Sequence, residues 1–352
     1  MEDLLPPESV VRLNDPESGL RGFIVIHSTV LGPAAGGCRL WQYADEAAAS
    51  IDALRLASGM TMKNALAGLP LGGGKAVLML PAAPFSRTRL FDAFGRAVAN
   101  LGGSYLTAED VGTSVDDMAL VRSQTSHVAG LPRRPDHPGG DPSPWTARGV
   151  FGAMQVAVKR RLGRCLDGLT VAVQGVGHVG FALCELLHAA GAKLVIAECR
   201  SDLAARAATR FGADLVSSRA IAEVPSDVFA PCALGGVLNL VTAASLRARV
   251  VCGPANNQLA APEVGDLLAA RGVLYAPDYL VNAGGIINVA GEYLSWTEGE
   301  VSTRVDGVAA RLAEVLDAAE RDGVTPEHAA ARVAYAVIER GGSAPAKRWL
   351  AA

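Results

Sequence analysis

Two lysines twelve residues apart, Lys63 and Lys75, lie in the stretch 60–77, where Ala, Leu, Met and Gly flank them. Ammonium groups are strongly hydrated, so apolar surroundings are costly for them. A lysine held there can have a lowered pKa and act as a base, while the other can hold a carboxylate. The three glycines before Lys75 let a backbone or a ligand come close. The alternative is two ordinary surface lysines around a turn.

A glycine-rich pattern follows the short β-branched run at residues 171–174. It has the form GxGxxG, and an apolar segment with helical character comes after it at 181–188. In a βαβ unit such glycines permit a tight turn, the approach of a pyrophosphate and close helix–strand packing. The pattern therefore predicts a dinucleotide site, which comprises Gly175, Val176, Gly177, His178, Val179 and Gly180. The alternative is a glycine-rich turn in another kind of βαβ unit.

An acidic residue stands where such a unit binds the ribose. A second strand candidate at 193–197 ends in Glu198, which is 23 positions after Gly175 and close to the spacing of about 20 expected for a ribose ligand. A carboxylate there favours NAD, because it repels the 2′-phosphate of NADP. Cys199 follows in the same site, and Arg200 softens the preference. The expected cofactor is NAD.

Two adjacent carboxylates, Glu109 and Asp110, follow a strand-like run at 104–106. Catalytic side chains often lie at such loop positions, and a carboxylate there can exchange a proton with a substrate amine. The asparagine-containing segments 253–258 and 282–285 also follow strand-like runs and can bind a carboxamide or a carboxylate. Each feature has an ordinary alternative, since Glu-Asp pairs are common in solvated loops and asparagine caps helices.

Taken together, these residues resemble the Glu/Leu/Phe/Val amino acid dehydrogenase family and are most similar to its phenylalanine and leucine dehydrogenases. Several blocks match in one consistent order, which is far more specific than any one block: 32–37, 60–77, 107–113, 175–180, 229–236, 255–257 and 275–285. The resemblance implies an α/β protein of two domains, with a mixed α/β substrate-binding domain and a Rossmann domain that contains a doubly wound parallel sheet. It also implies an active site in the cleft between them.

The implied domains are a substrate-binding and oligomerisation domain at 1–144, completed by C-terminal helices within 325–352, and an NAD-binding domain at 145–324. The residues agree with this division. The first part mixes strand signals with helical runs at 46–56 and 89–100, and late helical segments occur at 305–321 and 326–339. Alternating helix and strand signals indicate a parallel sheet in the second part, with strands at 171–174, 193–197, 227–230, 249–252 and 273–275.

The resemblance also assigns roles to individual positions. Lys63 would bind the substrate α-carboxylate, Lys75 would be the lowered-pKa base that activates water, and Asp110 would exchange a proton with the amino group. The remaining positions would frame the substrate or the cofactor. Gly36, Gly37 and Asn256 would frame the substrate, Thr146 and Asn282 would lie near the nicotinamide, and Cys232 and Ala233 near the cofactor. The implied reaction is reversible oxidative deamination to a 2-oxo acid and ammonia, with hydride transfer to nicotinamide C4.

Two positions bear on the substrate. Ala35 and Val289 stand where glutamate-specific members resemble a lysine and a serine, and a carboxylate left unpaired in an apolar pocket is heavily penalised. A hydrophobic L-amino acid is therefore expected. Ala35 leaves room, as in some phenylalanine dehydrogenases, whereas residues 255–259 and 275–280 are more similar to leucine or valine enzymes. The substrate is expected to be of the phenylalanine or leucine/valine type, with a slight preference for an aromatic or large aliphatic side chain.

Three features depart from the family pattern and bear on substrate range, namely Trp145, Arg148 and the segment 131–138. They leave two alternatives open. One is an oxidoreductase of the same fold that acts on a non-standard amino acid or an amine intermediate. The other is a non-catalytic sensor of NAD and an amino acid, against which the intact Lys63, Lys75 and Asp110 argue.

Composition limits the remaining classes. A net charge of −3 argues against a nucleic-acid-binding surface, and no run approaches the ~18 apolar residues that span a bilayer. The acidic stretch 1–8 lacks a signal-peptide pattern. The six cysteines lack CxxC spacing, so neither a zinc site nor a disulfide framework is indicated. We expect a cytoplasmic, metal-free enzyme with small-molecule partners, and the family resemblance implies a homo-oligomer.

Overall fold

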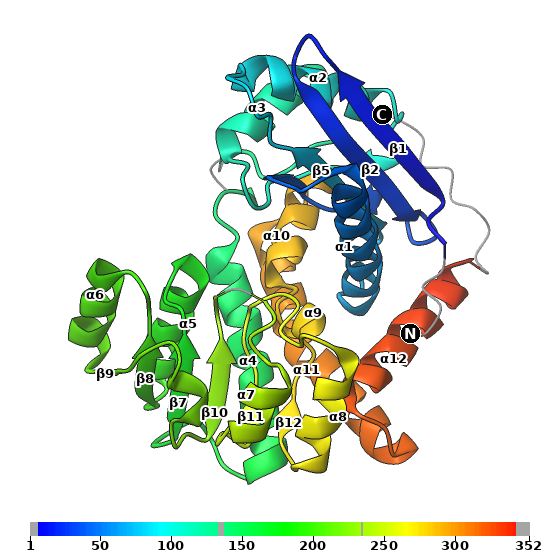
Figure 1. Cartoon of the computed structure of the whole chain (residues 1–352). Helices are drawn as coiled ribbons and strands as arrows, with labels where there is room; N and C mark the ends of the chain where they lie inside the picture. The colour runs from blue at the N-terminus through cyan, green and yellow to red at the C-terminus, as the bar shows by residue number, and fades with distance from the viewer. Residues whose placement is uncertain (1–5, 133–136, 234, 343–352) are drawn as a thin grey trace. The chain divides into compact units, whose positions relative to one another are not determined.

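The chain folds into two compact units, each with its own β-sheet. The computed structural model describes residues 6–132, 137–233 and 235–342. Unit 1 comprises Met1–Asp141, Asn288–Val301 and Ala334–Ala352, and unit 2 comprises Pro142–Ile287 and Ser302–Val333, as far as these residues are described. Figure 1 shows the elements of both units. The expected α/β fold with a Rossmann-type parallel sheet is confirmed.

Unit 1 contains a mixed sheet. Its strands follow the order β1-β2-β5-β3-β6, and β4 also pairs with β5. The first two pairings, β1 with β2 and β2 with β5, are antiparallel, while β3 and β4 run parallel to β5 and β3 runs parallel to β6. The strand bounds are Ser9–Asp15 (β1), Leu20–Ser28 (β2), Ala34–Ala35 (β3), Cys38–Trp41 (β4), Gly72–Met79 (β5) and Tyr105–Leu106 (β6).

Helices cover both faces of this sheet. Helix α1 (Glu46–Leu66) begins at Asp45, whose side chain accepts a hydrogen bond from Ala48 N at 2.8 Å and so satisfies one of the free N–H groups of the first turn. Alanines four residues apart form its buried stripe and pack against the sheet: Ala49, Ala53 and Ala57 against Phe23, Val25 and Val77. Helices α2 (Arg87–Ala99) and α3 (Val115–Gln124) pack on the other face, with Ala76 and Leu78.

Unit 2 contains a parallel sheet of the order β12-β11-β10-β7-β8-β9. The order reverses direction around β7, which is the topological switch point where such sheets bind ligands. Its strands are Thr170–Gln174 (β7), Lys193–Ala197 (β8), Asp214–Leu215 (β9), Val228–Pro231 (β10), Val250–Val251 (β11) and Leu274–Tyr275 (β12). Its helical segments are α4 (Ser143–Leu162), α5 (His178–Ala189), α6 (Ser201–Phe211), η1 (Ile221–Glu223), α7 (Leu240–Ser245), α8 (Pro262–Ala270) and α9 (Asp278–Val281).

Three long helices contain the borders between the units: α10 (Gly284–Tyr293), α11 (Glu298–Asp322) and α12 (Pro326–Gly342). The segment 288–301, which the sequence expectation left in the NAD-binding part, belongs to unit 1. Its side chains explain why. Glu292 accepts hydrogen bonds from Gly130 N at 2.8 Å and Leu131 N at 3.0 Å, and Asn288 accepts one from Gly139 N at 3.3 Å. Within the expected C-terminal completion, residues 343–352 lie outside the described residues.

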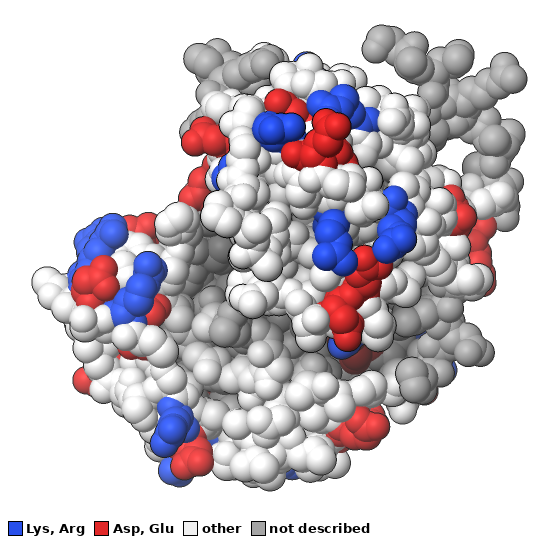
Figure 2. Space-filling model, turned by 45° about the horizontal axis from the view of Figure 1, so that its top comes forward, with Lys and Arg blue, Asp and Glu red and all other residues white. Residues whose placement is uncertain are grey.

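None of the helices described here is both long and apolar enough to cross a bilayer. On the face shown in Figure 2, basic and acidic side chains lie next to one another and form no broad area of one sign. Among the ion pairs of unit 1, Glu46 pairs with Arg12 and with Arg21, both at 2.8 Å.

The close contact between α1 and β5 yields a prediction. A methyl group at Gly73 on β5 would collide with the backbone nitrogen of Thr61 on α1, whereas one at Gly59, which is also on α1, would meet nothing within 4 Å. We expect Gly73→Ala to lower the free energy of unfolding by about 3 kcal/mol through overpacking and Gly59→Ala to raise it by about 0.5–1 kcal/mol through helix propensity. Urea unfolding of both variants checks this, and equal stability of the two would contradict it.

Candidate active site

Lys75 lies on β5 with its side chain only 7% exposed. The three glycines before it are part of the same strand. Methyl groups at Gly72 and Gly73 would collide with the backbone of Ser28 and Thr61. These glycines therefore let neighbouring backbone come close to β5, which is one of the two uses that the sequence left open. Their effect is to press the strand against α1 and to bury Lys75 beside it.

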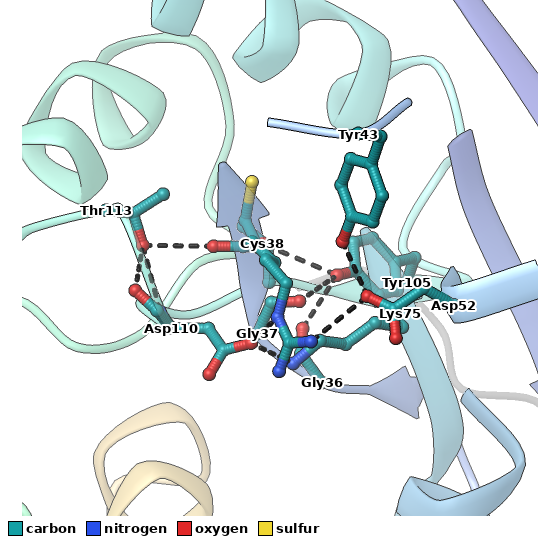
Figure 3. Close-up of polar contacts among 11 residues, drawn as sticks. Gly36, Gly37, Cys38, Tyr43, Asp52, Lys75, Tyr105, Asp110 and Thr113 are labelled. Atoms are coloured by element: carbon teal, nitrogen blue, oxygen red, sulfur yellow. Dashed lines mark hydrogen bonds and ion pairs between the residues drawn. The ribbon is translucent and has the colours of Figure 1, made fainter. Parts of the chain in front are cut away.

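Asp110 is the counter-charge of Lys75. Its carboxylate oxygen Oδ2 lies 2.5 Å from Lys75 Nζ (Figure 3). The loop after β6 holds Asp110 in place, because Asp110 N donates to the hydroxyl of Thr113 at 2.8 Å and that hydroxyl donates to Cys38 O at 3.0 Å. Burial alone would raise the pKa of Asp110, but the charge and hydrogen bond of Lys75, the charge of Arg39 and the backbone N–H of Val111 together outweigh it and lower the pKa to about 2. Asp110 is thus a carboxylate at neutral pH.

The glycines Gly36 and Gly37 bring a third segment to this pair. A methyl group at Gly37 would lie 2.9 Å from Asp110 Cβ, and one at Gly36 would collide with Gly74 O. The hydroxyl of Tyr105 donates to Gly36 O at 2.6 Å and fixes this backbone (Figure 3). Only residues without a side chain fit between β5 and the loop of Asp110.

The other substrate residues expected from the sequence lie on α1, β3 and α10 and in unit 2. Lys63 is half-buried on α1, one turn before the helix ends. Ala35 is fully buried in β3, so its methyl group faces no solvent-filled space in this structure. Val289 is half-buried on α10, within the segment that belongs to unit 1. Asn256 belongs to unit 2. The contacts described above place Lys75, Asp110, Gly36 and Gly37 in one cluster.

In unit 2 the glycine pattern forms the turn between β7 and α5. Gly175 has a φ of 96°, which favours glycine, and a methyl group there would lie 2.9 Å from Ala233 Cβ. A methyl group at Gly180 would lie 2.2 Å from Gly175 O. By contrast, a methyl group at Gly177 would meet nothing within 4 Å. Gly177 is the N-cap of α5 and provides no side-chain cap. The first turn of the helix begins at His178 and Val179, and the N-terminus of a helix suits a phosphate.

Glu198 follows β8 and contacts the same turn. Its Oε2 accepts a hydrogen bond from Val176 N at 2.8 Å, and its Oε1 accepts one from Arg200 N at 3.0 Å. Burial would raise the pKa of Glu198, but these backbone N–H groups outweigh it and lower the pKa. An ionised carboxylate therefore stands at the end of β8. Cys199 beside it is exposed, with its sulfur 3.4 Å from the hydroxyl of Ser218.

Asn282 has a buried amide with one open hydrogen-bonding position. Its Nδ2 donates to Asn256 Oδ1 at 2.7 Å and to Pro254 O at 3.1 Å, while its Oδ1 is buried and has no hydrogen-bond partner among the described residues. An unsatisfied buried acceptor costs about 1–3 kcal/mol. A carboxamide N–H₂ group, such as that of a nicotinamide, has the donor that this oxygen lacks. Together with the open turn and Glu198, this makes the residues of unit 2 a good fit for NAD.

Three other residues expected near the cofactor have structural contacts. The hydroxyl of Thr146 donates to Pro142 O at 3.1 Å in its own helix. Cys232 contributes its backbone N–H to Gln174 O at 2.8 Å, and burial raises the pKa of its thiol. Ala233 is exposed and packs against Gly175. Cys232 and Ala233 thus lie beside the glycine turn, whereas nothing in these contacts shows a cofactor role for Thr146.

The unusual residues on α4 also have partners. Arg148 forms a two-point ion pair with Asp306, at 2.8 and 2.5 Å, and its guanidinium lies 6.0 Å from the ring of Trp145. These contacts attach α4 to α11. Of the unfamiliar segment 131–138, residues 133–136 lie outside the described residues.

Sequence reasoning missed one part of the cluster, a second cation beside Asp110. Arg39 Nε donates to Asp110 Oδ2 at 3.3 Å, and Arg39 Nη1 donates to Asp52 Oδ2 at 3.0 Å. The hydroxyl of Tyr43 donates to the same oxygen of Asp52 at 2.5 Å. Arg39 stands two residues after Gly37, but nothing local indicates its partners. Only the pairing of β4 with β5 shows that Arg39 faces the same side as Lys75.

Comparison with known proteins agrees with this geometry. Residues 7–127 match the model of the Glu/Leu/Phe/Val dehydrogenase dimerisation domain, and residues 197–341 match that of glutamate/leucine/phenylalanine/valine dehydrogenase. The chain belongs to the Glu/Leu/Phe/Val dehydrogenase family. It is therefore an NAD-dependent amino acid dehydrogenase, as expected from the sequence.

Individual relatives cover almost the whole chain. Leucine dehydrogenase from Thermoactinomyces intermedius is 46% identical over 94% of this chain and 91% of its own length. Valine dehydrogenase from Streptomyces albus is 45% identical over 93% and 91%. The crystal structure of L-tryptophan dehydrogenase from Nostoc punctiforme has a TM-score of 0.84 at 37% identity and covers 97% of this chain and 98% of that one.

The ion pair predicts a pH-dependent stability. In the folded state the pKa of Asp110 is about 2, below the value of about 3.9 expected when the chain is unfolded. The pair therefore stabilises the fold above pH ~4 by about 2 kcal/mol, and this contribution is lost as the pH falls through about 2. We expect Asp110→Asn to be less stable than the wild type at pH 7, with a difference that halves near pH ~3. Urea unfolding from pH 7 to 3 measures it, and a constant difference would argue against the pair.

Glu198 predicts the choice of cofactor. We expect Glu198→Gln to raise kcat/KM for NADP⁺ about tenfold, because the carboxylate that repels a 2′-phosphate is gone, and to lower kcat/KM for NAD⁺. Initial rates with both cofactors provide the measurement. Glu185→Gln, at an exposed position on α5, is the matched control and should leave the ratio unchanged. An unchanged ratio in Glu198→Gln would refute this role.

Proposed function

We propose that this chain catalyses the reversible, NAD-dependent oxidative deamination of a hydrophobic L-amino acid to its 2-oxo acid and ammonia. The observation that carries the proposal is the buried Lys75–Asp110 pair beside the side-chain-free backbone of Gly36 and Gly37. Such a pair offers a proton donor and a proton acceptor within one hydrogen bond of each other. Membership of the family supports the same reaction.

The residues of unit 1 have separate roles in binding and converting the substrate. Lys63, as an ammonium on α1, binds the α-carboxylate. Asp110 takes a proton from the substrate ammonium group through its oxygen Oδ1, because Oδ2 is occupied by Lys75 and Arg39. When bound, NAD accepts the hydride that leaves Cα. Lys75, in its neutral amine form, then takes a proton from the water molecule that adds to the imine carbon. Asp110 returns its proton to the nitrogen, and the adduct breaks down to the 2-oxo acid and ammonia. Gly36 and Gly37 frame the substrate with backbone groups.

Unit 2 supplies the cofactor site. The turn at Gly175–Gly180 binds the pyrophosphate, Glu198 binds the ribose, and Asn282 accepts a hydrogen bond from the nicotinamide carboxamide. The open space at Gly177 and the unsatisfied oxygen of Asn282 support these roles. Asn256, which fixes the amide of Asn282 at 2.7 Å, orients it. The ionised Glu198 supports a preference for NAD over NADP.

We infer a substrate with an aliphatic or aromatic side chain. Ala35 offers no charge to a side-chain carboxylate, and the similarity to a leucine and a valine dehydrogenase, at 46% and 45% identity, favours a branched aliphatic side chain. The similarity to an L-tryptophan dehydrogenase keeps an aromatic side chain in the same range. An amine intermediate as substrate, or a non-catalytic sensor, receives no support from the site or from the relatives.

We also propose a homo-oligomer that works in the cytoplasm. Residues 7–127 match a family model described as a dimerisation domain. Within the described residues β1 is an outermost strand with one neighbour, and its side chains are mostly exposed, as an edge that a second copy covers would be. All six cysteines are free, which suits a reducing compartment.

A substrate panel tests the proposal. We expect NAD⁺ reduction with L-leucine, L-valine or an aromatic amino acid, little with L-glutamate, and a loss of about 10²- to 10⁴-fold in kcat for Lys75→Ala. NADH binding, measured by fluorescence, should survive in that variant. Lys193→Ala, at an exposed position on β8, is the control and should keep its activity. NADH binding without turnover of any amino acid in the wild type would overturn the proposal.

A further inference from the structure

Arg39 has no part in the reaction as described so far, yet it lies at the centre of the charged cluster. It belongs to β4, which pairs in parallel with β5 so that Arg39 lies opposite Val77. Side chains alternate along a strand, and Val77 packs against α1. Arg39 therefore projects from the same face of the sheet as Lys75, the face that α1 covers. Its side chain is 23% exposed, so most of the side chain is removed from solvent.

The contacts of Arg39 connect the loop of Asp110 to helix α1. Its Nε contacts Asp110 Oδ2 at 3.3 Å, and its Nη1 contacts Asp52 Oδ2 at 3.0 Å. Asp52 is in turn fixed by the hydroxyl of Tyr43, at 2.5 Å (Figure 3). Because a guanidinium is planar and rigid, two simultaneous carboxylate contacts define its orientation. Tyr43 and Asp52 thus hold Arg39 in one position.

The two oxygens of Asp110 have different surroundings. Oδ2 contacts both Lys75 and Arg39, whereas Oδ1 contacts neither cation. In Figure 3 this second oxygen points away from Lys75. Two cations on one oxygen prevent the carboxylate from rotating. They leave the other oxygen available to a group from outside the protein.

We propose that Arg39, held by Asp52 and Tyr43, is the positioning residue of Asp110 and fixes its carboxylate so that Oδ1 meets the amino group of the substrate. This inference rests on the proposed function. It assigns Arg39 no contact with the substrate and no proton transfer.

The need for a second cation follows from the role of Lys75. Lys75 can accept a proton only in its neutral form, and a neutral Lys75 holds a carboxylate less strongly than an ammonium does. Arg39 stays protonated throughout. Burial would lower the pKa of Arg39, but the charges of Asp110 and Asp52 outweigh it and raise the pKa. Arg39 therefore keeps Asp110 in place in both states of Lys75.

The charge of Asp110 responds to several neighbours. The titratable groups that interact electrostatically with it are Lys75 from β5, Arg39 and Cys38 from β4, Tyr105 from β6 and Glu109 from its own loop. Only the first two are cations. Loss of Arg39 therefore removes one of two cations and raises the pKa of Asp110. The acidic limb of the kcat/KM profile, where Asp110 gains its proton, should move to higher pH.

The test compares Arg39→Met with Arg39→Lys. We expect Arg39→Met to lower kcat by about 10- to 100-fold, as small misplacements of reacting groups do, with KM for NAD⁺ unchanged and the acidic limb displaced upward. Arg39→Lys should recover part of kcat, because a lysine keeps the charge but cannot contact both carboxylates in one plane. Asp52→Asn and Tyr43→Phe keep the arginine but weaken the contacts that hold it. These two variants should give smaller losses of kcat in the same direction.

Arg21→Met is the matched control. Arg21 also links the sheet to α1, through Glu46 at 2.8 Å, but it does not contact Asp110. If Arg39 were only structural, both arginine variants would lose stability and neither would change the pH profile. An unchanged acidic limb and an unchanged kcat in Arg39→Met would overturn the inference.

A second measurement separates this inference from the proposed function. Crystal structures of wild type and Arg39→Met show the orientation of Asp110 without any need for turnover. A carboxylate that rotates away from its wild-type position supports the positioning role, even if the wild type proved inactive on amino acids. A carboxylate that keeps its wild-type orientation in Arg39→Met would overturn it, even in an active enzyme.

Discussion

The buried ammonium group of Lys75 constrains much of the structure of unit 1. A charge this far from water requires a counter-charge nearby, because an unpaired buried ion is very costly. Asp110 supplies it at 2.5 Å, which in turn requires the loop after β6 to turn back beside β5. Glycine occupies positions 36–37 and 72–74 because a side chain at most of these positions would collide with neighbouring backbone. The need to pair one charge thus explains both the glycine-rich segments and the path of the loop.

The two halves of the site differed in how well the sequence predicted them. The cofactor half is local, since Gly175, Gly180 and Glu198 act within one βαβ unit, and both the turn and the strand end appear where the spacing placed them. The substrate half is not local. Lys75 and Asp110 stood out by residue type, but their pairing links residues 35 apart. Arg39 escaped notice because its partners depend on the register of β4 against β5 and on the packing of α1.

The same distinction applies to the fold. Five of the six described parallel strands of unit 2 were predicted from short apolar runs, although β11 shortens to Val250–Val251. Strand β9 (Asp214–Leu215) was missed, because it has only two residues and both are exposed. Helix α1 continues to Leu66, ten residues beyond the run expected at 46–56. Gly59 and Thr61 are poor helix formers, and burial against β5 outweighs their local preference. The assignment of 288–301 to unit 1 depends on Glu292 and the backbone of Gly130, a contact between distant segments that no local pattern reveals.

The balance of charge in the cluster has a consequence for how substrate reaches it. Lys75 and Arg39 carry two positive charges, and Asp110 and Asp52 carry two negative charges. A neutral group of alternating charges produces a field that fades within a few ångströms, well inside the screening length of about 8 Å in physiological salt. An amino acid zwitterion is also neutral, so long-range attraction adds little to its rate of encounter. The charges of this cluster therefore act on a substrate only at short range, and the rate of substrate capture should be nearly independent of ionic strength.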